Sequence, residues 1–202
     1  MITIVDYGLG NVNAFLNVYR RLNIAAGTAS RAEDLQGAVK VILPGVGAFD
    51  HAMALLNQSG MRETLDDLVM RQQVPVLGVC VGMQMLGRDS EEGRLPGLGW
   101  IQGRVRSLTS MTASLPVPHM GWNDAEPAAT EPLFDRLESP ARFYFLHSYY
   151  FDCDRPEDAI AMAEYGGRFA CAVRARNVYG VQFHPEKSHH YGVQLLKNFA
   201  GL

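Results

Sequence analysis

Short runs of apolar residues alternate with segments of helical periodicity along the first half of the chain. The apolar runs cover residues 2–5, 39–43 and 75–79, and apolar side chains recur at helical spacing across residues 12–22. Entirely apolar strands of this length are typical of parallel sheets that helices cover on both faces. In such sheets ligands bind at the carboxyl ends of the strands. We therefore predict an α/β fold whose functional loops follow these runs.

The second half of the chain has a less regular pattern. Strand-like stretches, several with alternating apolar and polar positions, occur at residues 104–108, 143–146, 159–163, 170–174 and 178–183. Alternation favours antiparallel or edge pairing, so we expect a mixed sheet. A helix that stops near Gly201 is predicted to end the chain. Its buried face carries Tyr191, Leu195, Leu196 and Phe199.

Length, composition and charge narrow the possible classes of protein. At 202 residues the chain suits a single domain over residues 1–202, and its 48% hydrophobic and 19% charged residues are typical of a folded globular protein. The formal net charge is −3 and no block of like charges occurs, so nucleic acid is not an expected partner.

Neither a targeting segment nor a membrane-spanning segment is predicted. The first apolar run is short, lacks the basic start of a signal peptide and meets Asp6 at once. The longest apolar stretch, residues 74–86, contains Pro75 and Gln84 and is too short to span a membrane. We therefore expect a cytoplasmic protein with no membrane partner.

The three cysteines are Cys80, Cys153 and Cys171. Their odd number and the lack of C-x-x-C spacing argue against a disulfide framework and a zinc knuckle, and we expect no metal. Cys153 and Cys171 are interpreted as structural thiols. The histidine pair at 189–190 is interpreted as a surface pair at a helix start, because no third ligand accompanies it.

Cys80 differs from the other two cysteines in its neighbours. It lies between Gly78 and Gly82, where an apolar strand gives way to a helical segment. A nucleophile on a strained strand-to-helix turn requires close backbone approach on both sides, which glycines permit. A helix N-terminus also favours the thiolate. Taken alone, the motif is better explained by a core cysteine between packing glycines.

A base for such a thiol is present near the end of the chain. His184 and Glu186 follow an apolar strand and flank Pro185, which keeps the backbone extended so that both side chains leave on one face. Glu186 then accepts from the imidazole and orients it. The triplet alone is better explained as an exposed turn, but together with the G-x-C-x-G motif it predicts a Cys–His–Glu triad.

A nucleophilic site of this kind also requires an oxyanion hole. The backbone N–H of Val81 is one expected donor. A second is expected from the loop that contains Gly45, Val46 and Gly47, although these glycines are also compatible with an ordinary turn.

Seven stretches carry a resemblance to a known family. They are residues 6–11 (DYGLGN), 44–49 (PGVGAF), 78–84 (GVCVGMQ), 90–93 (SEEG), 118–123 (PHMGWN), 147–149 (HSY) and 183–188 (FHPEKS). With these motifs, spread over nearly the whole length, the chain resembles the class I, triad-type glutamine amidotransferases. D-Y-G-x-G-N and P-H-M-G-W-N narrow the resemblance to the glutaminase subunits of imidazole glycerol phosphate synthases. The resemblance implies a flavodoxin-like three-layer sandwich with a mostly parallel mixed central sheet.

The resemblance also implies a reaction and a substrate site. Cys80 attacks the carboxamide of L-glutamine, His184 protonates the departing ammonia, and water cleaves the thioester, with no cofactor. The oxyanion hole corresponds to Val46, Gly47 and Val81. The residues that hold glutamine correspond to Gly45, Gln84, Glu92, His147, Ser148 and Tyr149.

A partner is part of the same resemblance. The family's partner is a (βα)8-barrel cyclase that receives ammonia through a sealed passage, which protects the ammonia from protonation and loss in bulk water. Residues Asn11, Met120, Trp122 and Lys187 correspond to its docking surface, with ordinary exposed polarity, or core packing for Trp122, as the alternative. In the family, the loop that matches Gly45, Val46 and Gly47 reorients when the partner binds substrate, so the isolated chain is expected to be weakly active.

Other readings remain open. The family's usual C-L-G is C-V-G here, and the paired histidine at 189–190 resembles paralogues that supply ammonia for amidation of an acetamido sugar in surface polysaccharide synthesis. A regulatory module with a vestigial triad and a cysteine peptidase on a related sheet are further alternatives. The presence of all three triad residues favours an enzyme, and Gln84 with Glu92 argues against a peptidase.

Overall fold

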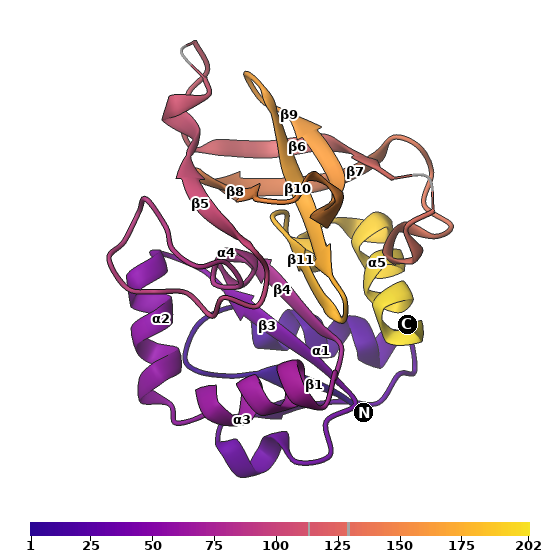
Figure 1. Cartoon of the computed structure of the whole chain (residues 1–202). Helices are drawn as coiled ribbons and strands as arrows, with labels where there is room; N and C mark the ends of the chain where they lie inside the picture. The colour runs from indigo at the N-terminus through magenta and orange to yellow at the C-terminus, as the bar shows by residue number, and fades with distance from the viewer. Residues whose placement is uncertain (113, 129) are drawn as a thin grey trace.

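The computed structural model describes residues 1–112, 114–128 and 130–202, and its elements join into one sheet (Figure 1). Five strands pair in parallel in the order β2-β1-β3-β4-β11. Their bounds are Ile2–Val5 (β1), Ala26–Ala29 (β2), Lys40–Gly45 (β3), Val76–Cys80 (β4) and Val178–Val181 (β11). Apart from the edge strand β2, these strands are almost entirely buried, as their apolar sequences predict.

The sheet continues beyond β11 as an antiparallel region in the order β10-β9-β6-β7, with β8 pairing β10 and β5 pairing β8. The bounds are Gly103–Ser107 (β5), His119–Pro127 (β6), Ala141–His147 (β7), Tyr149–Cys153 (β8), Ala159–Glu164 (β9) and Arg168–Ala175 (β10). The predicted mixed sheet is therefore confirmed, with its parallel pairing confined to the strands around β4.

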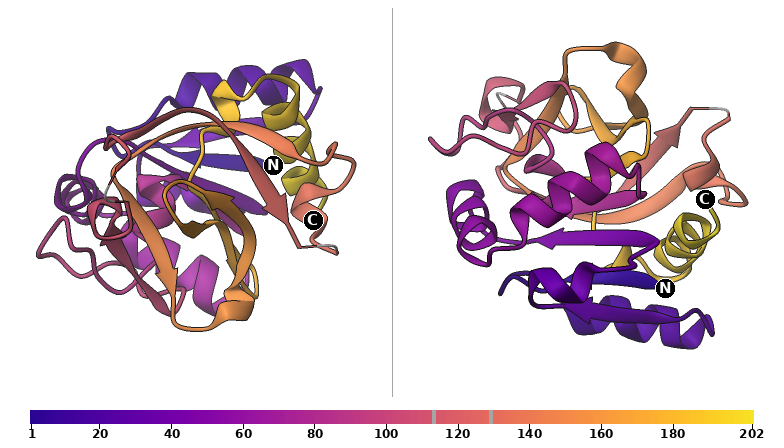
Figure 2. Two further views of the ribbon diagram at one scale, coloured as in Figure 1. Left: turned by 90° about the horizontal axis from the view of Figure 1, so that it is seen from above. Right: turned by 60° about the horizontal axis from the view of Figure 1, so that its bottom comes forward.

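Helices lie on both faces of the parallel strands (Figure 2). They are α1 (Val12–Arg21), α2 (Phe49–Gln58), α3 (Arg62–Asp66), α4 (Val81–Gln84) and α5 (His189–Gly201). Short helical turns are η1 (Ala32–Leu35), η2 (Asp67–Arg71), η3 (Leu108–Ser110), η4 (Pro132–Phe134), η5 (Pro156–Asp158) and η6 (Pro185–Lys187). Within the described ranges, no helix is long and apolar enough to cross a membrane.

Several strands depart from the sequence-based expectation. β3 does not end before Pro44 but continues through Gly45. Its pairing with β1 stops at Ile42, whereas its pairing with β4 continues through Pro44 to Gly45. The backbone N–H that Pro44 lacks is therefore not required for the pairing that remains. β11 ends at Val181, short of the expected residue 183. Strands β2, β6 and β8 were not predicted. The positions of β6 that alternate onto its more buried face, among them His119, Gly121 and Asn123, give no apolar pattern to recognise.

Candidate active site

The turn between β4 and α4 holds Cys80 in a strained backbone conformation. Its φ is 55° and its ψ −114°, values that an L-residue adopts only when its surroundings enforce them. A Cβ on Gly78 would lie 2.6 Å from the carbonyl oxygen of Gly82, and a Cβ on Gly82 would collide with the carbonyl oxygen of Leu43. Both glycines of the motif are therefore required by close backbone packing, as predicted.

Strand register brings the end of the chain beside Cys80. β4 lies between β3 and β11, with Gly45 opposite Cys80 on one side and Val181 opposite Val79 on the other. The backbone after β11 continues to His184, whose N–H donates to the carbonyl oxygen of Tyr144 in β7 at 2.9 Å. Parallel pairing of β4 and β11 thus brings the thiol and the imidazole together, although they lie far apart in the sequence.

His184 and Glu186 form a buried pair. The His184 Nδ1 lies 2.9 Å from Oε1 of Glu186, and each side chain is only 4% exposed. The other carboxylate oxygen, Oε2, is buried and has no hydrogen-bond partner among the described residues. The hydroxyl of Ser188 donates to the His184 carbonyl oxygen at 2.6 Å and so holds the turn between them. The arrangement leaves Nε2 of the imidazole as the nitrogen that serves the thiol.

The electrostatics of this pair favour a protonated imidazole. Burial lowers the pKa of His184, but hydrogen bonding with Cys80 and with Glu186 outweighs it and raises that pKa from 6.5 to about 9. An imidazolium beside a thiol stabilises the thiolate, which is the nucleophilic form. The Cys80 Sγ itself lies 3.9 Å from the carbonyl oxygen of Leu146 and 3.8 Å from Nε2 of Gln182.

A cavity of about 300 Å³ opens over Cys80 and His184. Predicted oxyanion and substrate residues in its wall are Val46, Gly47, Val81, Gln84, Glu92, His147, Ser148 and Tyr149. Its remaining lining residues are Pro118, Leu146 and Lys187. The structure therefore gathers most of the residues singled out from the sequence around one hollow of the size that a small metabolite needs.

Gly45 is the exception among those residues. It is buried in β3 and does not line the cavity, because a Cβ there would collide with the backbone nitrogen of Gly82. Its position is explained by close packing of β3 against the turn after Cys80. Close packing thus accounts for a glycine at position 45, and its expected contact with glutamine stays a prediction.

Gln84 and Glu92 both line the cavity, and different hydrogen bonds hold the two side chains. The Gln84 Nε2 donates to the carbonyl oxygen of Tyr149 at 3.3 Å and to Oε1 of Gln182 at 3.1 Å. One oxygen of Glu92, Oε2, accepts from the backbone N–H of Phe49 at 2.8 Å. Each side chain is thereby held by protein contacts while it faces the hollow.

His147 uses both ring nitrogens within the protein. Its Nδ1 lies 2.8 Å from the Tyr149 carbonyl oxygen, and its Nε2 lies 2.9 Å from Nδ1 of His119. A carbonyl oxygen only accepts, so Nδ1 carries the proton and His119 donates to Nε2. Burial lowers the pKa of His147 to about 3 and that of His119 to about 4, so both rings are neutral near pH 7.

The residues expected at a docking surface differ in their surroundings. Met120 is 66% exposed and Trp122 42% exposed on β6, and the Trp122 ring stacks on His189 with centroids 5.2 Å apart. Core packing therefore does not account for Trp122. Lys187 lines the cavity, whereas Asn11 caps α1 by accepting from the Ala14 N–H at 3.2 Å.

Sequence reasoning missed two polar residues of the site, Gln182 beside the thiol and His119 beside His147. Both are buried, at 0% and 3% exposure. Gln182 stands two positions before His184, and alternation along an extended segment was a signal that both side chains share a face. Nothing in the sequence indicated that His119 would contact His147 from a neighbouring strand.

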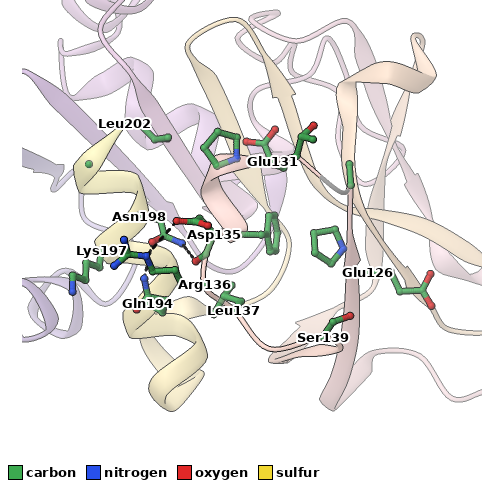
Figure 3. Close-up of a pocket in the computed structure, with 16 residues that line it drawn as sticks. Glu126, Glu131, Asp135, Arg136, Leu137, Ser139, Gln194, Lys197, Asn198 and Leu202 are labelled. Atoms are coloured by element: carbon green, nitrogen blue, oxygen red, sulfur yellow. Dashed lines mark hydrogen bonds and ion pairs between the residues drawn. The ribbon is translucent and has the colours of Figure 1, made fainter.

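A second, wider cavity lies away from the thiol. It measures about 850 Å³ between the segment around η4 and helix α5, and shares no lining residue with the cavity over Cys80 (Figure 3). Asn198 closes part of its wall by donating to the carbonyl oxygens of Leu133 and Asp135. Its lining mixes acidic and basic side chains without a buried nucleophile, and we assign it no role.

Comparison with known proteins agrees with the fold and the motifs. The model of the class-I glutamine amidotransferase family matches residues 4–201, so the chain belongs to this family. A crystal structure of a glutamine amidotransferase has the same fold, with a TM-score of 0.76 at 19% identity, and covers 100% of this chain and 99% of the other. The family predicted from the motifs is thereby confirmed.

Full-length relatives narrow the similarity from the whole family to one kind of subunit. The imidazole glycerol phosphate synthase subunit HisH of Bdellovibrio bacteriovorus is 60% identical over 202 residues, and the alignment covers 99% of both chains. The subunit HisH of Leptospira interrogans is 52% identical over 204 residues, with both chains covered completely. The narrower resemblance to the glutaminase subunits of these synthases is thus also confirmed.

Proposed function

We propose that this chain is the glutaminase subunit of an imidazole glycerol phosphate synthase and hydrolyses L-glutamine to glutamate and ammonia. The observation that carries the proposal is the convergence of Cys80, His184 and Glu186 at one cavity, in a chain whose relatives bear that subunit's name. Residues 1–202 act as one domain in this proposal, in keeping with the single sheet that joins both halves of the chain.

The reaction uses the thiolate–imidazolium pair. The Cys80 sulfur attacks the carboxamide carbon of glutamine, and the oxygen takes the negative charge. His184 gives its proton to the leaving nitrogen as the carbon–nitrogen bond breaks, which releases ammonia and leaves a thioester. The imidazole, now neutral, takes a proton from water as it attacks the thioester, and glutamate leaves. Glu186 orients the imidazole throughout.

The oxyanion and the amino-acid end of glutamine require separate partners. In the proposal, the backbone N–H of Val81 and an N–H from Val46 or Gly47 hold the oxyanion. The Gln84 Nε2 is committed to Tyr149 and Gln182, so its Oε1 is the atom that accepts from the substrate ammonium. Glu92 and the segment at 147–149 complete the pocket, and no cofactor is involved.

The proposed partner is a (βα)8-barrel cyclase subunit that forms a heterodimer with this chain. It uses the ammonia to make imidazole glycerol phosphate and AICAR from PRFAR in histidine biosynthesis. The exposed side chains of Met120 and Trp122 on β6, and Lys187 at the cavity, support a docking surface on this side of the molecule. Asn11 is proposed to extend it. A cytoplasmic location goes with this pathway.

The alternatives have less support. The names of the relatives do not favour the paralogue that amidates a sugar. A vestigial triad does not account for the strained Cys80 backbone and the buried His184–Glu186 contact. The cavity over Cys80 is a small hollow rather than a groove along which a peptide strand would lie.

The test is a glutaminase assay with purified chain, alone and with the barrel subunit and PRFAR. We expect weak glutamate release alone and strong stimulation by the partner with its substrate. A glutamine-like electrophile should label Cys80 under the stimulated condition. No stimulation and no adduct on Cys80 would contradict the proposal, whereas labelling without stimulation by this partner would point to another ammonia acceptor.

A further inference from the structure

One carbonyl oxygen determines the orientation of a chain of buried amides and imidazoles. The carbonyl of Tyr149 accepts only, so the Gln84 group 3.3 Å away must be the amide nitrogen. The same nitrogen donates to Gln182 at 3.1 Å, which requires Oε1 of Gln182 at that contact. The remaining group of Gln182, its Nε2, therefore faces the Cys80 sulfur at 3.8 Å.

The other side of the Tyr149 carbonyl is held in the same way. It accepts from Nδ1 of His147 at 2.8 Å, and His119 donates to the second nitrogen of that ring. Asn123 completes the chain with its Nδ2 at 3.3 Å from Nε2 of His119. Since each donor and acceptor role follows from the one before, the Gln182 amide cannot flip without leaving a buried donor opposite a donor.

We propose that Gln182 is a further catalytic residue, whose side-chain N–H stabilises the Cys80 thiolate and whose carbonyl oxygen holds Gln84 with its own oxygen toward the substrate. The placement follows from strand register, because Val181 lies opposite Val79 and the next residues on the two parallel strands are Gln182 and Cys80. Gln182 is fully buried, so water does not replace its contact with sulfur. The expected effect of Gln182 on turnover rests on the proposed glutaminase function, whereas its effect on the Cys80 thiolate does not.

The thiolate can be measured without glutamine or a partner. Alkylation of Cys80 by iodoacetamide, followed by mass spectrometry of the peptide that contains it, reports the thiolate fraction at each pH. Cys153 and Cys171 do not interfere, because only the Cys80 peptide is quantified. Ionisable groups that face this sulfur or line its cavity are Tyr7, Glu92, His147, Tyr149, His184, Glu186 and Lys187. All of them are unchanged in the variants.

Gln182→Met removes both the donor and the acceptor while keeping the shape of the side chain. A hydrogen bond to a charged group is worth enough to move the alkylation midpoint up by about one pH unit, which lowers the rate about tenfold below the midpoint. Gln182→Glu retains an acceptor for Gln84, removes the amide donor and adds a negative charge beside the sulfur, so its midpoint should rise by more than that of Gln182→Met. Thr3→Val, a buried polar-to-apolar change in β1, is the control and should leave the profile unchanged.

Steady-state kinetics of glutamine hydrolysis separate the two parts of the proposed role, the donor to the sulfur and the acceptor for Gln84. With glutamine and the partner system, Gln182→Glu should lower kcat with little change in KM, whereas Gln182→Met should lower kcat and raise KM because Gln84 loses a restraint. Folded variants with wild-type alkylation profiles would overturn the donor role. A shifted profile in a chain that hydrolyses no glutamine would uphold the donor role and reject the proposed function instead.

Discussion

The parallel and antiparallel regions of the sheet differ in what they expose. β1, β4 and β11 are buried along their whole length. Cys80 is the last residue of β4, and His184 lies in the segment that follows β11. β6 in the antiparallel region alternates buried and exposed positions and presents Met120 and Trp122 to solvent. The nucleophile thus belongs to the rigid region, and the candidate docking surface belongs to the open one.

The difference has a physical reason. A strained φ of 55° at Cys80 persists only where neighbouring backbone leaves no alternative, and parallel strands buried on both faces provide that. A docking surface needs apolar side chains that remain accessible, which an antiparallel sheet with one open face allows. The cavity over Cys80 lies where the two regions meet, with walls from both.

The strongest test of this division replaces one thiol in each region. Cys80→Ala should lower glutamine hydrolysis about 10⁴-fold or more, because no other group forms the thioester. Cys153→Ser on β8 should leave the rate within a few fold of wild type. Glutamate release under the stimulated condition measures both. Comparable losses in the two variants would remove the distinction between the regions.

The second test replaces one buried carboxylate in each region. Glu186→Gln should reduce kcat about 10²- to 10⁴-fold, as expected when the residue that orients a catalytic histidine is neutralised. It should also lower the pKa of His184 from about 9, since hydrogen bonding to the carboxylate helps to raise it. Glu131→Gln, which weakens the contact with Arg174, should reduce stability but not kcat. The pH–rate profile and thermal unfolding distinguish the two outcomes.

A third test concerns the open face of the antiparallel region. Trp122→Ala should weaken binding of the barrel subunit about tenfold or more, which is typical of an exposed aromatic anchor. Met70→Ala, a change at a similarly exposed apolar residue on the far side of the parallel region, should have no effect. Titration calorimetry measures both. Equal affinity for the Trp122 variant and wild type would place the docking surface elsewhere.

The smallest expected effect is on stability in acid. His119 and His147 have folded-state pKa values of about 4 and about 3, both below the ordinary 6.5, because burial disfavours the charged ring. As the pH falls, these two histidines are therefore protonated in the unfolded chain before they are protonated in the folded one. The stability present above pH 6.5 is lost as the pH falls toward 4. Urea unfolding at pH 7 and pH 5 should differ by about 1 kcal/mol or more per buried histidine.

His119→Phe provides the control for that prediction. It removes one of the two buried titrating rings while keeping an aromatic side chain between Phe145 and Tyr165, against which His119 stacks. The variant should lose less stability between pH 7 and pH 5 than wild type, whatever its stability at pH 7. An unchanged pH dependence would mean that His119 takes up its proton as readily in the folded as in the unfolded chain.

Much of the site could be predicted from local sequence. The glycines around Cys80 and the proline between His184 and Glu186 constrain the backbone over a few residues, so their geometry is encoded where they stand. The apolar runs likewise predicted β1, β3 and β4 to within two residues at either end. These features need no knowledge of which strands become neighbours.

The contacts between segments were decided only by the tertiary structure. The pairing of β11 with β4 sets Gln182 against Cys80, and the pairing of β6 with β7 sets His119 against His147. The pairing of β3 with β4 packs Gly45 against the turn after Cys80. Strand order and register are properties of the whole sheet, because each depends on how distant segments bury their apolar faces together. Local constraints therefore determined the nucleophile and its base, and global packing decided the polar groups that surround them.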